Sequence, residues 1–346
     1  MLGLDARAAR VTWTVFLVAV TLFALYSIRT VLLVFILSIL LAYVMSPVIA
    51  LVDRFASRKI PRPVSMGVAY LLLIALATGI LVTVGTEIAK EATALAQTLP
   101  QYIQNPKRLE QLPLPAWLQS QKQAIIDFIV EQVQEHQSEI VPMLTATGKT
   151  ILGALGNVIY VVLIPILSFF LLKEGPDWSR MLVSQFRHDG GRAFVEGILE
   201  DLHRLLADYM RALFLISITT FLVFTVCLGF MGVPYSLLLA AIAGAAEVVP
   251  VAGPLLSGAA IVLVAAFGGF SGLWWIVAFL VLYRLVLDYG ISPYIMGKGV
   301  ALSPLAILFG ILAGEQLGGI AGVFLAIPLM ATLRIVYLRY RESHAA

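Results

Sequence analysis

The apolar sequence of this chain is interrupted at residues 247–254, where glutamate, proline and glycine replace a hydrophobic run. The apolar segments on either side, Pro234–Ala246 and Leu255–Phe267, are each about 13 residues long, which corresponds to roughly 20 Å of α-helix. Because proline and glycine disfavour the interior of a helix, we expect two short helices joined by a turn. The turn contains Glu247, Pro250, Gly253 and Pro254.

A second interruption repeats the spacing of the first. Pro304 precedes Gly314 by the same interval that separates Pro234 from Gly244. The segment Ala301–Ala313 is also short, so it is either a half-span or a short crossing followed by the long final helix. The polar residues that follow the glycine are Glu315 and Gln316.

Composition places both interruptions in a membrane protein. Hydrophobic residues make up 60% of the chain and charged residues only 12%, against about 25% charged residues in soluble proteins. The apolar runs are continuous, whereas the strands of a membrane barrel alternate, so the sequence predicts an all-α integral membrane protein. The net charge of +3 is small and the basic residues cluster at the ends of spans, which argues against a nucleic-acid partner.

The segments beside the first interruption are too short to cross a bilayer. The hydrocarbon core is about 30 Å thick and needs about 20 helical residues. The two half-spans therefore predict a re-entrant hairpin that enters and leaves on the outer side. Irregular backbone at that depth is tolerated only against protein or water. Short, interrupted segments at matching positions are typical of the midplane binding site of a transporter.

Helix ends and a carboxylate meet in the predicted turn. The first helix ends there in free carbonyl groups, and Pro254 is suited to begin the second helix, whose N–H groups point into the same place. The turn therefore offers carbonyls for a cation, N–H groups for a polar solute, and Glu247 for a proton. Burial favours a neutral carboxyl group, and a nearby arginine favours the charged form. The alternative for Glu247 and Glu315 is a glutamate that reaches the membrane interface or forms an ordinary salt bridge.

Arg284 and Asp288 lie in the apolar helix predicted at Leu273–Tyr289. They are four residues apart and therefore share one helix face. Either the two residues simply satisfy each other, or Arg284 faces a cavity and pairs with Glu247 or Glu315 in one state of a transport cycle.

Glycines at every fourth position predict a packing surface near the second interruption. If that stretch is one helix, they form a flat groove that another helix can approach closely or slide along. Pro234 and Gly244 are expected to act as packing or hinge residues in the first hairpin. The repeated glycines are Gly310, Gly314, Gly318 and Gly322.

Basic residues set the predicted orientation. The loop Asp53–Pro63 carries four basic residues against one acid, and the C-terminal segment contains Arg334, Arg339 and Arg341. Since short loops rich in lysine and arginine stay in the cytoplasm, we expect about eight spans with both termini cytoplasmic.

The same pattern divides the chain into four parts. The third span is predicted at Val64–Thr86. The parts are an N-terminal transmembrane scaffold (residues 1–86), an extracytoplasmic amphipathic insert (87–149), a span at Thr150–Leu172 with a cytoplasmic amphipathic helix at Lys173–Arg211 (150–211), and a transport unit with two interrupted hairpins (212–346).

No motif in the sequence predicts catalysis, a cofactor or a metal site. The four histidines, His136, His188, His203 and His344, lie in different segments without the spacing of zinc ligands. Cys227 is the single cysteine. The nucleophile elbow, the paired-histidine zinc motif and the phosphate-binding loop are all absent from the sequence.

Several motifs between residues 208 and 330 resemble those of a known family. They are Asp208-Tyr-Met-Arg211, Gly232-Val-Pro234, Val249-Pro250-Val-Ala-Gly253-Pro254, Ser292-Pro293-Tyr-Ile-Met-Gly297-Lys298, Leu312-Ala-Gly314-Glu-Gln316-Leu-Gly318 and Leu325-Ala-Ile-Pro328. On these residues the chain resembles the autoinducer-2 exporter family of permease-like bacterial proteins. The resemblance implies an inner-membrane protein of about eight spans with re-entrant hairpins, assembled as a pentamer. It also implies export of the furanone signal autoinducer-2 in some members and sodium–proton antiport in others.

The chain departs from the family pattern in its polar residues. Arg284 and Asp288 stand where the family often has glutamine and glutamate, while Ser303 and Glu315 replace a usual histidine and glycine. Ala212-Leu213 follow Arg211 where glycine and glutamine are usual. Because these changes fall on the predicted polar lining, they bear on the substrate more than on the family.

The sequence therefore predicts a secondary transporter that exports a small polar solute and couples export to an inward proton or sodium gradient. The family resemblance implies autoinducer-2 as that solute. The solute is expected between residues 247–254 and 314–319, near Arg284. An alternative within transport is a sodium or lithium–proton antiporter that uses Glu247 and Asp288. An alternative of another class is a membrane scaffold or channel subunit that transports nothing itself.

The predicted topology can be tested with single cysteines in a Cys227→Ser background. We expect a cysteine at Gln119 to react with an impermeant maleimide in intact cells, because residues 87–149 lie outside, and a cysteine at Ser57 to stay protected in the cytoplasm. Labelling at Ser57 but not at Gln119 would show that the orientation is inverted.

Overall fold

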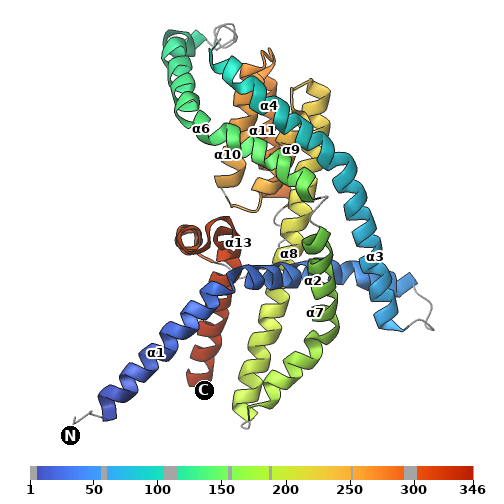
Figure 1. The fold of residues 1–346 in the computed structure, drawn as a ribbon, viewed down its shortest axis with the longest axis vertical. Coiled ribbons are helices and arrows are strands. Elements are labelled where there is room, and N and C mark those ends of the chain that lie inside the picture. Colours follow the sequence, from blue (N-terminus) through green and yellow to red (C-terminus); the bar gives the residue numbers. More distant parts are fainter. Residues whose placement is uncertain are drawn as a thin grey trace. The chain divides into compact units, whose positions relative to one another are not determined.

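The protein is nearly all helical and has no strands in the residues that its computed structural model describes, which are 6–55, 61–104, 116–154, 158–186, 189–250, 252–291 and 302–345. This confirms the predicted all-α class for those residues. The elements in Figure 1 are α1 (Ala6–Ser27), α2 (Arg29–Phe55), α3 (Arg62–Ile80), the π-helix η1 (Leu81–Gly85), α4 (Thr86–Gln104), the 3-10 helix η2 (Ala116–Gln121), α6 (Lys122–Ala154), α7 (Val158–Ser184), α8 (Asp189–Met231), α9 (Ser236–Ala246), α10 (Ala252–Phe267), α11 (Leu273–Leu285), the π-helix η3 (Val286–Ile291) and α13 (Pro304–Ala345).

Five helices among the described residues are long and apolar enough to cross a membrane. Shorter apolar helices accompany them, including α9 and α10, so the chain has the helical composition of a multi-span membrane protein. The count of eight spans, the re-entrant path of the hairpin and the orientation of the termini stay predictions. The five long segments are Val31–Arg54, Pro63–Gln104, Gly190–Met231, Leu273–Gly290 and Ala321–Arg341.

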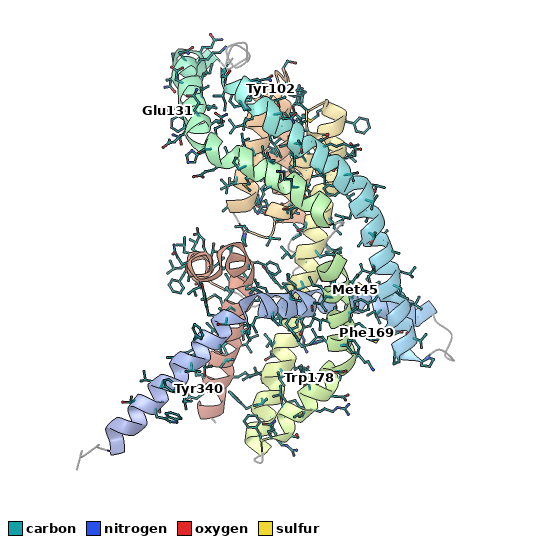
Figure 2. All side chains as sticks on the ribbon, viewed as in Figure 1. Met45, Tyr102, Glu131, Phe169, Trp178 and Tyr340 are labelled. Carbon is teal, nitrogen blue, oxygen red and sulfur yellow. The ribbon has the colours of Figure 1, made fainter. Side chains whose placement is uncertain are left out.

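The chain forms two compact units, residues 1–70 with 159–178, and residues 71–158 with 179–346. In the first unit, the hydroxyls of Tyr70 and Ser168 lie 2.6 Å apart in a buried position. The ring of Phe169 packs edge-on against Tyr70, and Met45 is also buried; Met45 and Phe169 are labelled in Figure 2. The contacts of Tyr70 with Ser168 and Phe169 join α3 and α7.

The helix that contains the predicted third span continues well past Thr86. An uninterrupted helical segment of 42 residues runs from Pro63 to Gln104, through the π-helical turn η1. Within α4 the buried residues recur every three or four positions, as in an amphipathic helix. They are Ala89, Ala92, Leu95, Ala96, Leu99 and Ile103.

The predicted boundaries of the cytoplasmic helix, Lys173 and Arg211, are wrong. Helix α7 runs through Lys173 to Ser184, and α8 begins at Asp189 and continues through Arg211 to Met231. Because no proline occurs between Pro176 and Pro234, nothing in the sequence stops α8 where the charged part meets the apolar part. The predicted span Thr150–Leu172 is likewise divided between α6 and α7, with residues 155–157 outside the described part of the chain.

Close packing of α9 on α8 organises the core of the second unit. A side chain at Gly244 of α9 would place its Cβ 2.9 Å from the Ser217 carbonyl oxygen and 3.0 Å from Phe221 Cβ, both on α8. Only glycine lets the two backbones approach this far. Around this contact α8, α9, α10 and α11 share one apolar core. Its least exposed members include Leu228, Leu239, Ile261, Ile276 and Leu287.

Helix α13 consists of two arms that meet at Gly319, the residue with positive φ (56°) inside it. A Cβ at Gly314 would overlap the backbone of Gly322, and a Cβ at Gly322 would overlap the backbone of Gly314. The two arms therefore contact each other through these glycines. Gly310 extends this contact, since its Cβ would lie 2.8 Å from Met330 Cγ.

The prediction of one continuous glycine groove is therefore wrong. The break at Gly319 separates Gly322 from the three earlier glycines, and a Cβ at Gly318 would meet nothing within 4 Å. The positive φ, a conformation that favours glycine, belongs to Gly319, so the chain breaks there and not directly after Gly314. Three of the four glycines serve packing between the arms, and Gly318 does not.

Gly314→Ala and Gly318→Ala are expected to change stability in opposite directions. The first forces the two arms apart and should lower the free energy of unfolding by about 1–3 kcal/mol, as overpacking does. The second replaces a helical glycine in open space and should raise it by about 0.5–1 kcal/mol. Thermal unfolding of the purified protein in detergent compares the two, and equal midpoints would refute the packing contact.

Candidate functional site

The chain turns sharply between α9 and α10. The amides of Val248 and Val249 donate to the carbonyls of Ala245 and Ala246, over 3.3 and 2.9 Å, and the amide of Gly253 donates to Val249 over 3.0 Å. These bonds confirm two short helices joined by a turn. They also show that some of the carbonyl groups predicted to be free accept hydrogen bonds within the turn itself.

Gly253 makes this turn possible. A Cβ at Gly253 would overlap the carbonyl of Ala246, the last residue of α9. Gly253 and Pro254 lie in the first turn of α10, which begins at Ala252, so Pro254 occupies the predicted early position where a missing amide costs little. Pro250 is half-buried in the turn, whereas residue 251 is outside the described residues. Because Gly253 has no side chain, the end of α9 can lie directly against the start of α10.

Glu247 is the C-terminal cap residue of α9, and its side chain is only 9% exposed. The hydroxyl of Thr220 on α8 lies 3.2 Å from Glu247 Oε1 and donates to it. Arg284 Nη1 on α11 lies 3.6 Å from Glu247 Oε2. Since an isolated buried carboxylate is costly, the hydroxyl and the guanidinium make the ionised form tolerable.

Arg284 contacts two carboxylates at once. Its Nε donates to Asp288 Oδ2 over 2.7 Å, while Nη1 faces Glu247. Nη1 is buried and has no hydrogen-bond partner among the described residues, so the contact with Glu247 is a charge pair at 3.6 Å. Arg284 therefore pairs with Asp288 on its own helix face and also with Glu247 from another element. The side chains of Arg284 and Asp288 are 39% and 41% exposed, which leaves this end of the cluster open.

Thr220 and Tyr283 complete the cluster, and the sequence did not single them out. Their hydroxyl oxygens lie 2.6 Å apart, and both side chains are buried. The ring of Phe224 packs edge-on against Tyr283, with centroids 4.9 Å apart. Thr220 sits in the apolar half of α8 and Tyr283 precedes Arg284. Hydroxyls inside apolar spans were the available signal, but the sequence alone does not say which of them meet.

Glu315 and Gln316 do not join this cluster. Both are exposed on α13, shortly before the break at Gly319. Among the described residues, no hydrogen bond or ion pair connects Glu315 with Glu247 or Arg284. Of the other predicted hinge residues, Pro234 packs closely on Gly268, whose Cβ would lie 2.7 Å from the proline ring. The motif at 292–298 lies outside the described residues.

The charges of this cluster do not balance, so a proton or a monovalent cation can neutralise it. With both carboxylates ionised, the cluster of Glu247, Arg284 and Asp288 carries one more negative than positive group. Uptake of one proton or one monovalent cation restores neutrality, which is favoured where the surroundings are apolar. The hydroxyls of Thr220 and Tyr283 add neutral oxygens beside Glu247. Among the described residues, no group of histidine, cysteine and acidic side chains could hold a metal ion in the usual way.

Comparison with known proteins identifies a family of membrane transporters. The model of the AI-2E family transporters matches residues 15–342. The protein YueF of Bacillus subtilis is 27% identical over 299 residues, covering 83% of this chain and 79% of YueF. The AI-2 transport protein TqsA of Escherichia coli is 25% identical over 290 residues, covering 82% of this chain and 80% of TqsA. The family match extends from α1 to α13, and the chain belongs to the AI-2E transporter family.

Proposed function

We propose that the protein is a secondary transporter that exports a small polar solute from the bacterial cytoplasm and uses Glu247 to couple export to a proton or sodium gradient. The observation that carries the proposal is the buried Glu247 carboxylate, 9% exposed, paired with Arg284 at the turn between two short helices. Burying a carboxylate in this position costs free energy, so it is expected to have a function. A relative whose name states AI-2 transport supports an autoinducer-2-like solute.

The coupling step follows from competition for Arg284. When Glu247 is ionised, Arg284 is held between two carboxylates. When Glu247 takes up a proton, its attraction for Arg284 falls and Asp288, 2.7 Å from Nε, becomes the preferred partner. The guanidinium is then free on one side to donate hydrogen bonds to the oxygen atoms of a polar solute. One proton thus changes the binding group that the solute meets.

A sodium or lithium–proton antiporter is the second candidate. It is favoured by the oxygen atoms gathered beside Glu247, where Thr220 Oγ1 lies 3.2 Å from the carboxylate and 2.6 Å from the hydroxyl of Tyr283. Oxygen ligands are those that hard cations prefer. In this case Glu247 would bind the cation and the proton alternately, without a separate solute.

The cellular setting of this function is part of the proposal. The protein would lie in the inner membrane with both termini in the cytoplasm and would assemble as a homo-oligomer, a pentamer by family resemblance. Residues 1–86 would serve as scaffold and residues 212–346 as the transport unit. The basic loop at 53–63 and the basic C-terminal segment support this orientation.

Glu247→Gln should abolish gradient-driven accumulation and leave solute exchange partly intact. Glutamine keeps the size and hydrogen bonding of the side chain but cannot ionise. Glu247→Asp should retain some coupling with a shifted pH optimum. Flux into proteoliposomes, measured with imposed proton and sodium gradients between about pH 5.5 and pH 8.5, a window that brackets a buried carboxyl group, compares both variants with the wild type.

The control is Glu200→Gln, which removes an exposed carboxylate that pairs with Arg204 on the same helix. It should transport like the wild type. Uphill transport by Glu247→Gln with the wild-type pH profile would make Glu247 structural. A scaffold or channel subunit would show only stability effects in Glu247→Gln and Arg284→Ala, and a sodium–proton antiporter would exchange the two ions without any added solute.

A further inference from the structure

Helix α4 contacts both ends of the hairpin that lie away from Glu247. The hairpin consists of α9, the turn and α10; Glu247 lies at the turn, whereas α9 begins and α10 ends at the opposite side. Ala92 and Leu95 of α4 form a buried cluster with Leu238 in the first turn of α9. Figure 1 shows α4 and α6 alongside the helices of this region. The predicted insert is therefore packed against the element that carries Glu247.

A carboxylate on α4 caps the start of α9. Glu91 Oε2 accepts a hydrogen bond from the amide of Leu238 over 2.8 Å. The first amides of a helix have no partner inside the helix, and they favour a negative charge. Tyr235, the residue before α9, has positive φ (58°), and its side chain makes no capping bond. Glu91, 147 residues away in the sequence, supplies what the local sequence lacks.

Two further contacts fix α4 to the same end of the hairpin. The hydroxyls of Thr98 and Tyr235 lie 2.9 Å apart. The ring of Tyr102 stacks on Phe267, the last residue of α10, with centroids 6.2 Å apart; Tyr102 is labelled in Figure 2. Glu91, Thr98 and Tyr102 are separated by seven and four residues, so they share one face of α4.

Helix α9 transmits a displacement from its first turn to Glu247. It has 11 residues, or about 16 Å at the usual rise, and Glu247 is its C-terminal cap. Five of its residues are buried, and Gly244 fixes its approach to α8. A short helix packed in this way moves as a rigid rod, so a change at Leu238 shifts the carboxylate at the other end relative to Arg284.

We infer that Glu91 is a positioning residue for Glu247: by holding the first turn of α9, it sets the distance between the Glu247 carboxylate and the Arg284 guanidinium. The role of Glu247 in transport rests on the proposed function, but the positioning of the turn by Glu91 does not. Glu91 acts through its hydrogen bond with the backbone amide of Leu238 and through the length of α9.

The test combines a readout of position with a readout of transport. A single cysteine is placed at Val248, beside Glu247, in a Cys227→Ser background, and its reaction rate with a maleimide is measured in detergent-solubilised protein. Glu91→Leu should raise that rate roughly tenfold, since a hydrogen bond to a charged group is lost. Glu91→Gln, whose amide oxygen can still accept from Leu238, should raise it less. The matched control is Glu87→Leu, which removes an exposed carboxylate one turn earlier on α4, paired with Lys90.

Without the added cysteine, Glu91→Leu should also change the pH profile of flux in proteoliposomes, and Glu91→Gln should restore the profile in part. Wild-type reaction rates and pH profiles in both Glu91 variants, per folded oligomer, would overturn the proposal, even if the yield of folded protein falls. If the cysteine reaction accelerates but the wild-type protein shows no flux, the positioning role holds and the proposed transport function fails. A response of Glu87→Leu equal to that of Glu91→Leu would also overturn it.

Discussion

A buried carboxylate can remain ionised in an apolar protein only where hydrogen-bond donors and a positive charge reach it. For Glu247 these groups come from two other helices, since Thr220 lies on α8 and Arg284 on α11. The arrangement depends on close backbone contact. Gly244 lets α9 approach α8, and Gly253 lets α10 begin directly against the end of α9. Replacing either glycine would move the carboxylate away from its partners before any charge is altered.

The cluster around Arg284 has the asymmetry that a switch requires. Asp288 holds the guanidinium by a hydrogen bond from Nε on the same face of α11 and η3, whereas Glu247 holds it from another element by a longer charge contact. Contacts within one helix face persist when helices move, while contacts between elements can be exchanged. In the proposed mechanism, protonation or cation binding at Glu247 would weaken the contact between elements and leave the local pair intact, which would release the hairpin to move.

Local patterns predicted much of this molecule, and long-range contacts account for the rest. Proline and glycine located the break beside Glu247, and the four-residue spacing predicted the pair of Arg284 and Asp288. The ends of helices were less predictable: α8 passes through Arg211 because a change from charged to apolar residues does not stop a helix. The sequence also placed the second break at Gly314, whereas the positive φ belongs to Gly319. Thr220, Tyr283 and Glu91 escaped prediction because their partners are 27 to 147 residues away.

The cap on α9 explains why the insert and the hairpin should be considered together. A helix usually takes its first hydrogen-bond acceptor from the residue just before it. Here that residue is Tyr235, in a left-handed conformation that provides no side-chain cap, and the acceptor comes from Glu91 on α4. A local cap would have satisfied the first turn of α9 without α4. A cap supplied by α4 makes the position of α9 depend on α4, and the stacking of Tyr102 on Phe267 extends this dependence to α10. Any movement that carries the hairpin must therefore either carry α4 with it or break the bond between Glu91 and Leu238.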